Sequence, residues 1–97
     1  GIRAPMVGHM GDGNFHVVLP YDPKKKEMYK QLRAFNDTLI RKALELNGTI
    51  TGEHGVGLHK KEYLLEQHPD NIPVMKSIKR TLDPNNIMNP GKIFDLN

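Results

Sequence analysis

Apolar residues recur through the middle of the chain at alternating intervals of three and four positions, the spacing of one face of an amphipathic helix. Asp22 and Pro23 are residue types favoured where a helix begins, and Asn47-Gly48 is a pair favoured where one ends. We therefore predict a long helix over residues 23–46. Its apolar stripe consists of Met28, Leu32, Phe35, Leu39, Ala43 and Leu46.

Shorter patterns flank this helix. Residues 4–10 and 14–19 predict two strands around a turn, and the β-branched run 49–51 predicts a third strand. Helical spacing returns over residues 58–67 and 72–82. Four side chains of the later helix are expected to face a core: Val74, Met75, Ile78 and Leu82.

The tail after residue 82 is rich in turn formers but keeps four apolar side chains, so we expect a loop that packs against something else. These side chains are Ile87, Met88, Ile93 and Phe94. The order of elements is typical of the α+β class: a small antiparallel sheet with helices packed on one face, followed by C-terminal helices and a tail.

Asp12-Gly13 is a favoured two-residue hairpin loop, and it lies midway between two histidines. With that turn, His9 pairs with His16 on one face of the hairpin, with Cβ atoms roughly 4.5–5.5 Å apart. Two imidazoles at this separation can share one metal ion. The alternative is a polar cross-strand pair on a solvated face of the sheet.

Glycines surround an adjacent carboxylate and imidazole in the segment TGEHGVG. If this loop folds back on the hairpin, Glu53 can complete a three-ligand set with the two histidines. Three protein ligands with open positions are typical of a catalytic metal site, and imidazole and carboxylate suit Zn, Mn, Fe or Co. His54 would then stand beside the metal, able to accept a proton. Taken alone, the segment is also compatible with a plain glycine-rich turn.

Composition narrows the classes of protein and partner. The 97 residues are 26% charged and contain no cysteine, which excludes disulfides and thiolate chemistry. The net charge is +3, but only three Tyr and three Phe are present and none lies among the basic runs, so no nucleic-acid partner is expected. We see no transmembrane segment and no targeting signal in this sequence, and expect a cytoplasmic location or one at the periphery of a membrane.

Three segments in series resemble one known family: GHMGDGNFH, then TGEHGVG, then DPNNIMNPGKIF. They are similar to the C-terminal part of FAD-linked 2-hydroxy-acid dehydrogenases, namely the D-lactate dehydrogenase, glycolate oxidase and D-2-hydroxyglutarate dehydrogenase relatives among vanillyl-alcohol-oxidase-like flavoproteins. The resemblance extends over about residues 4–94. It implies that residues 1–97 are the C-terminal segment of a ferredoxin-like substrate or cap domain, and that an N-terminal FAD-binding domain lies outside this chain.

The resemblance also implies residue roles. His9, His16 and Glu53 would bind a divalent metal, Zn or Mn, that holds the hydroxyl and carboxylate oxygens of the substrate. His54 would take the hydroxyl proton while the hydride passes to the flavin. The tail residues Asn89, Gly91 and Lys92 would lie near the flavin.

A small 2-hydroxy acid is the substrate that the resemblance implies. Val18 stands where hydroxyglutarate-type relatives carry asparagine, which favours D-lactate or glycolate over a five-carbon diacid. A quinone, a cytochrome, an electron-transfer flavoprotein and oxygen stay open as electron acceptor. The isolated segment is expected to be inactive. Two other hypotheses are a flavin-independent metal hydrolase that uses the same residues and a non-catalytic cap or assembly module.

Overall fold

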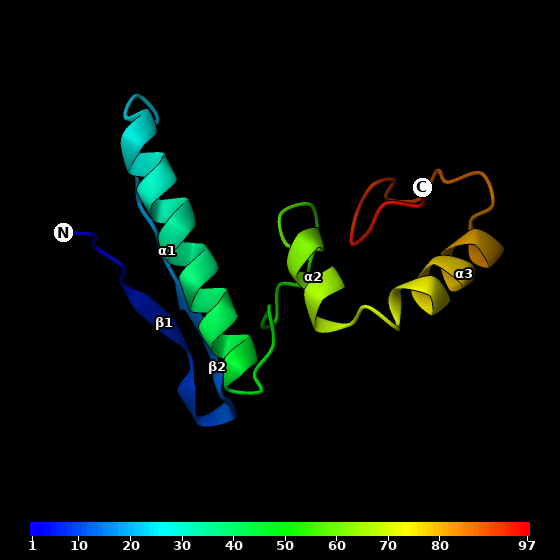
Figure 1. Cartoon of the computed structure of the whole chain (residues 1–97), viewed down its shortest axis with the longest axis horizontal. Coiled ribbons are helices and arrows are strands. Elements are labelled where there is room, and N and C mark those ends of the chain that lie inside the picture. Colours follow the sequence, from blue (N-terminus) through cyan, green and yellow to red (C-terminus); the bar gives the residue numbers. More distant parts are fainter. The chain divides into compact units, whose positions relative to one another are not determined.

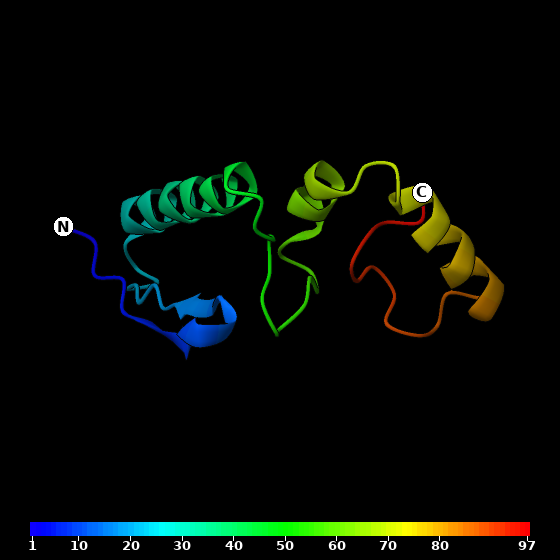
Figure 2. The same ribbon diagram turned by 90° about the horizontal axis from the view of Figure 1, so that it is seen from below.

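A computed structural model describes all 97 residues, which form two compact units, residues 1–53 and residues 54–97 (Figure 1). The first unit holds an antiparallel hairpin and one long helix. Strand β1 spans Met6–His9, strand β2 spans Asn14–Val17, and the 3-10 turn η1 (Met10–Asp12) joins them. Helix α1 (Lys26–Glu45) forms a second layer over the hairpin. Figure 2, turned by 90° from Figure 1, shows the helix and the hairpin as two separate layers. The predicted α+β class is confirmed.

The register of the hairpin differs from the prediction. His9 pairs with Asn14 and His16 pairs with Val7, so the two histidines are diagonal neighbours and not directly opposite. The reason is the turn: Gly13 alone is left-handed (φ 71°), and its N–H donates to Met10 O at 3.1 Å. A type I′ turn centred on Asp12-Gly13 needs positive φ at both residues, which Asp12 does not adopt; the four loop residues are Met10 to Gly13, so the turn is centred one residue earlier than predicted.

Helix α1 begins three residues later than predicted. The Asp22 carboxylate accepts a hydrogen bond from the backbone N–H of Lys24 at 3.0 Å. The backbone carbonyl of Asp22 accepts one from the N–H of Lys25, so a turn precedes the helix. The predicted end is close to the observed one, and Asn47 takes the left-handed conformation there (φ 60°). Of the predicted stripe, Leu32 is buried, Leu46 is exposed and the rest are half-buried.

The predicted strand over residues 49–51 is wrong, because these residues form a loop. The sheet has two strands, and the hydroxyl of Thr49 donates to Thr51 O at 2.6 Å. Ile50 is nevertheless buried. The β-branched run therefore reflects the burial of one side chain and not the pairing of its backbone in a sheet.

The second unit contains two helices, α2 (Lys61–Gln67) and α3 (Ile72–Leu82). Helix α3 has the predicted bounds, whereas α2 begins three residues later than predicted because residues 58–60 form turns. The buried apolar side chains of this unit are Tyr63, Leu64 and Ile72. No helix of the chain combines the length and the apolar character that crossing a bilayer requires.

The apolar face of α3 does not enter this core. Val74, Ile78 and Leu82 are 60%, 55% and 76% exposed, and Met75 is half-buried. The tail side chains Ile87, Met88 and Ile93 are likewise exposed. The prediction that this face lies inward is wrong for these 97 residues, since nothing in the second unit packs on it.

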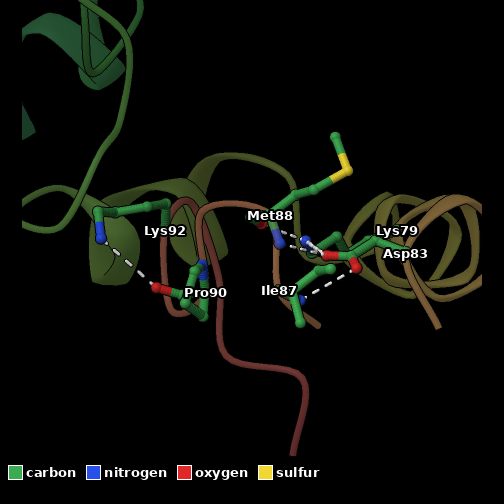
Figure 3. A network of polar contacts seen from close by, with 6 residues as sticks. All are labelled: Lys79, Asp83, Ile87, Met88, Pro90 and Lys92. Carbon is green, nitrogen blue, oxygen red and sulfur yellow. Dashed lines mark hydrogen bonds and ion pairs between the residues drawn. The ribbon is translucent and has the colours of Figure 1, made fainter. Parts of the chain in front are cut away.

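Asp83 is a buried carboxylate that ties the tail to the end of α3 (Figure 3). Lys79 forms an ion pair with it, and its two oxygens accept the N–H groups of Ile87 and Met88 at 3.0 and 2.9 Å. Lys79 also donates to Met88 O. The hydrogen bond from Lys79, together with those from the two amides, holds the pKa of Asp83 below its ordinary value.

Replacement of Asp83 by Asn is expected to loosen the tail in a pH-dependent way. The folded-state pKa is depressed, so the carboxylate stabilises the fold above its unfolded pKa of about 3.9, and this contribution is lost as pH falls through the folded value. Amide exchange at Ile87 and Met88 should be faster in Asp83→Asn at pH 7, and the difference from wild type should narrow below about pH 4. Hydrogen–deuterium exchange measures this, with the exposed Asp70→Asn as control. A difference that is constant with pH would contradict the assignment.

Candidate functional site

Two imidazoles lie on one face of the hairpin. Because paired residues share a face and every second residue of a strand does so too, His9, Asn14 and His16 are on the same side. His9 comes from the end of β1 and His16 from the middle of β2. The shift in register thus separates the two histidines along the hairpin but keeps them on one face.

Glu53 brings these two imidazoles together. Its Oε1 accepts a hydrogen bond from His16 Nε2 at 2.9 Å, and its Oε2 lies 3.9 Å from His9 Nε2. The His16 side chain is 28% exposed, Glu53 48% and His9 68%, so the cluster is open to solvent on the His9 side. One carboxylate therefore bridges the two rings, because the loop that carries it folds back onto the hairpin.

Asn14 and Gly52 bring the Glu53 loop against the hairpin. A Cβ on residue 52 would lie 1.9 Å from Asn14 Oδ1, so only glycine allows this close approach without a shift of the Asn14 side chain. Asn14 Oδ1 is buried and has no hydrogen-bond partner. Asparagine close to an Asp-Gly pair is expected to be a turn former. Its place two residues before His16 on the same strand face is the feature that could have identified it.

The donor set fits a divalent metal. Each histidine Nε2 lies within 4 Å of one oxygen of Glu53, 2.9 Å for His16 and 3.9 Å for His9, and the two contacts are to different oxygens. The Glu53 carboxylate supplies the negative charge that attracts a cation. Imidazole nitrogen and carboxylate oxygen suit Zn and Mn alike. The geometry is compatible with the predicted ligand set, and metal binding itself stays a prediction.

Gly52→Ala is expected to weaken metal binding by about 10- to 100-fold, the range seen when groups that orient ligands are changed. The added Cβ must displace the Asn14 side chain or shift the loop that carries Glu53. Titration calorimetry with Zn²⁺ or Mn²⁺ measures the affinity. Gly11→Ala is the matched control, because a Cβ there meets no atom within 4 Å. Equal affinities for the two variants would contradict the role of Gly52.

His54 follows Glu53 directly and is the first residue of the second unit. It is exposed, and the peptide bond keeps its Cα about 3.8 Å from that of Glu53. Gly55 and Gly57, which come next, both have positive φ (79° and 54°). The chain therefore turns sharply just after His54. The role of this histidine as a base stays a prediction.

The predicted tail residues lie in a tight loop of the second unit. Asn89 and Gly91 have positive φ (47° and 73°), and the Lys92 ammonium reaches only Pro90 O, at 3.4 Å (Figure 3). The N–H of Ile93 donates to Gly57 O at 2.8 Å. Two motifs far apart in the sequence, the tail and the end of GEHGVG, are thus hydrogen-bonded.

Lys61 strengthens this connection, and sequence reasoning missed it. Its ammonium donates to Gly91 O at 3.1 Å and forms an ion pair of 2.7 Å with Asp95. No local sequence pattern distinguishes Lys61 from its neighbour Lys60.

A hollow of about 490 Å³ lies elsewhere in the first unit and contains no residue of the predicted site. The rings of Tyr21 and Tyr29 are 5.4 Å apart at this hollow. The full lining is Tyr21, Pro23, Lys26, Tyr29, Lys30 and Arg33. The candidate metal cluster is therefore a surface site on the hairpin and not part of this hollow.

Comparison with known proteins defines the class. Residues 1–93 match the family described as FAD linked oxidases, C-terminal domain, and the chain belongs to that family. It is 47% identical over 96 residues to a probable mitochondrial D-lactate dehydrogenase of Danio rerio, covering 98% of this chain and 19% of that protein. It is 48% identical over 91 residues to the mitochondrial D-lactate dehydrogenase (cytochrome) 1 of Saccharomyces cerevisiae, covering 92% of this chain and 15% of that protein.

A third relative carries a different name. The glycolate oxidase subunit GlcD of Bacillus subtilis is 44% identical over 88 residues, covering 90% of this chain and 19% of that protein. The chain thus spans a fifth or less of the length of these relatives. The resemblance predicted from the three motifs is confirmed at the level of the family.

Proposed function

We propose that this chain is the C-terminal segment of a flavin-dependent enzyme that oxidises a small D-2-hydroxy acid to the 2-oxo acid. Its part is to supply the metal ligands His9, His16 and Glu53 and the base His54. The observation that carries this proposal is the convergence of two imidazole Nε2 atoms on the two oxygens of Glu53, in a member of an FAD-linked oxidase family.

The metal and the flavin would supply different chemistry. A divalent ion held by the three ligands supplies positive charge, which makes a nearby hydroxyl group easier to deprotonate. FAD, when bound, supplies the acceptor for the hydrogen and electron pair that leave C2. The exposed Lys92 ammonium at the tail is suited to contact an anionic part of that cofactor. Most of the FAD site is proposed to lie in a preceding domain.

His54 would act as the base. A ring nitrogen takes the proton of the substrate hydroxyl while C2 loses its hydrogen with both electrons, so that the C2–O single bond becomes a double bond. Its position directly after a metal ligand supports this role, since a base must stand within hydrogen-bond reach of the group that the metal binds. The positive φ of Gly55 lets the chain turn away immediately afterwards.

D-lactate or glycolate is the proposed substrate. Two of the relatives reported above are named D-lactate dehydrogenases and one a glycolate oxidase subunit, and Val18 offers no polar group to a second carboxylate. For the electron acceptor we retain a quinone, a cytochrome or an electron-transfer flavoprotein. For the location we retain the cytoplasm or the periphery of a membrane, although two of these relatives are named as mitochondrial.

The test uses the full-length, flavin-loaded protein. Initial rates with D-lactate, glycolate and D-2-hydroxyglutarate are measured with an artificial electron acceptor, before and after treatment with a chelator, and metal content is determined in parallel. We expect turnover of a short 2-hydroxy acid that falls on chelation and returns with Zn²⁺ or Mn²⁺. Ester or amide hydrolysis without flavin would favour the hydrolase hypothesis. The absence of both turnover and bound metal would favour a non-catalytic module.

A further inference from the structure

The hollow at the start of helix α1 takes no part in the proposed chemistry, and two tyrosine rings form much of its wall. Tyr21 comes from the loop before the helix, and Tyr29 lies at the end of the first helical turn. The ring centroids are 5.4 Å apart with an interplanar angle of 48°, so the two rings are in contact. Both side chains are nevertheless exposed. The hollow therefore offers an aromatic surface that solvent can reach.

Lys26, Lys30 and Arg33 give the hollow a positive charge. Their spacing of four and three residues places them on one side of α1, away from the stripe that carries the buried Leu32. All three are exposed, and no carboxylate lines the hollow. Lys30 forms an exposed ion pair of 3.6 Å with Glu27, whereas Lys26 and Arg33 have no acidic partner. The charge of this hollow is therefore largely uncompensated.

These cations do not stabilise the helix that carries them. A positive charge in the first turn is opposed by the helix dipole, and like charges three or four residues apart repel each other. Lys25, at the N-cap position, makes no capping hydrogen bond with its side chain. A bound anion would relieve the repulsion between Lys26, Lys30 and Arg33. The stability of the helix thus gives no reason for this arrangement, whereas the binding of an anion does.

The size and the chemistry of the hollow indicate the class of ligand. Its volume of about 490 Å³ lies within the range of about 300–1,000 Å³ that small-molecule sites occupy. The tyrosine rings, Pro23 and the aliphatic part of the Lys26 side chain favour a flat apolar group. The Arg33 guanidinium favours a phosphate or a carboxylate. We propose that the hollow binds a small aromatic anion, a planar ring that carries a phosphate or carboxylate group, at a site separate from the candidate metal cluster.

The experiment measures the affinity of the full-length, flavin-loaded protein for phenyl phosphate and for benzoate by titration calorimetry. Inorganic phosphate and phenol, the two halves of phenyl phosphate, are titrated in parallel. We expect phenyl phosphate to bind at least about tenfold more tightly than either half, because the ring and the charge are held together. Binding of benzoate alone would also support the proposal and would identify the acid group as a carboxylate. Binding of neither aromatic anion would refute it, and phosphate that binds as tightly as phenyl phosphate would reduce the site to an adventitious anion.

Three variants test whether the hollow is the place of binding. Arg33→Gln should bind phenyl phosphate at least about tenfold more weakly, because a charge-assisted hydrogen bond is lost. Tyr29→Leu should weaken phenyl phosphate but leave inorganic phosphate unchanged, because only the ring contact is removed. Lys25→Gln is the matched control, since it removes the same charge beside the hollow from a residue that does not line it. All three side chains are exposed, so the variants should fold.

Hydrogen–deuterium exchange of the wild type, with and without phenyl phosphate, locates the bound ligand. Protection should appear in residues 21–33, and protection confined to other segments would refute the proposal. Lys25→Gln that binds as weakly as Arg33→Gln would overturn it in favour of a diffuse effect of charge. None of these readouts needs turnover or bound metal. Failure of this site and failure of the proposed function are therefore seen separately.

Discussion

His16→Ala is expected to remove the divalent ion from the full-length protein and to lower kcat/KM for the 2-hydroxy acid by about a thousandfold, which is about 4 kcal/mol of transition-state stabilisation. The His16 imidazole is the best-packed of the three proposed ligands and lies 2.9 Å from the Glu53 carboxylate. Without it, one imidazole and one carboxylate stay on an open surface, too few ligands to retain the ion at neutral pH. Metal analysis and initial rates measure the two effects.

The matched control for this variant is His59→Ala, which removes an exposed imidazole that the proposed ligand set does not include. The control should keep both metal and turnover. Flavin content should be the same in both variants, because FAD is proposed to be held mainly by the preceding domain. If His16→Ala retains its metal and its rate, the metal centre is refuted while the assignment to the family stands.

His54→Gln is expected to retain the metal but to lower kcat by about 10²- to 10⁴-fold, the contribution typical of a general base. Glutamine keeps much of the size and polarity of the imidazole but takes up no proton near neutral pH. KM should change little, since the proposed substrate contacts are made through the metal. Flavin reduction should therefore be slower in the variant than in the wild type at each pH measured.

Stopped-flow measurement of flavin reduction as a function of pH tests this prediction on the chemical step alone. His59→Gln is the control and should follow the wild-type profile. A His54→Gln variant that loses its metal would instead make this residue a ligand. A variant that keeps the wild-type rate and profile would exclude it as the base.

The hairpin illustrates which details follow from a sequence and which do not. The alternation of residues predicts the two strands and the shared face of His9 and His16, because side chains alternate with a period of two. The position of the turn is not fixed by this alternation, and the structure places the four loop residues at Met10 to Gly13, centred one residue earlier than predicted. The pairing of the two strands therefore differs from the prediction, while His9 and His16 still lie on the same face of the hairpin. The predicted strand over residues 49–51 failed for a related reason, since β-branched residues pack equally well in a buried loop.

The site residues divide in the same way. His9, His16 and Glu53 are visible in the sequence because metal-binding side chains with glycine neighbours are chemically distinctive. Asn14 and Lys61 cannot be recognised in this way. Their roles depend on Gly52 and Gly91, which lie 38 and 30 positions further along the sequence. A contact of that kind leaves no trace in local composition.

By itself the sequence determined the identity of the reactive groups, the α+β class and the family, since these depend on residue types and on their local periodicity. Only the tertiary structure decided that Glu53 reaches both imidazoles, that the tail bonds to the GEHGVG segment, and that the apolar side of α3 faces outward. Each of these depends on loop closure and packing over tens of residues. Periodicity marks a side chain as apolar, whereas the surfaces available in the fold decide what covers it.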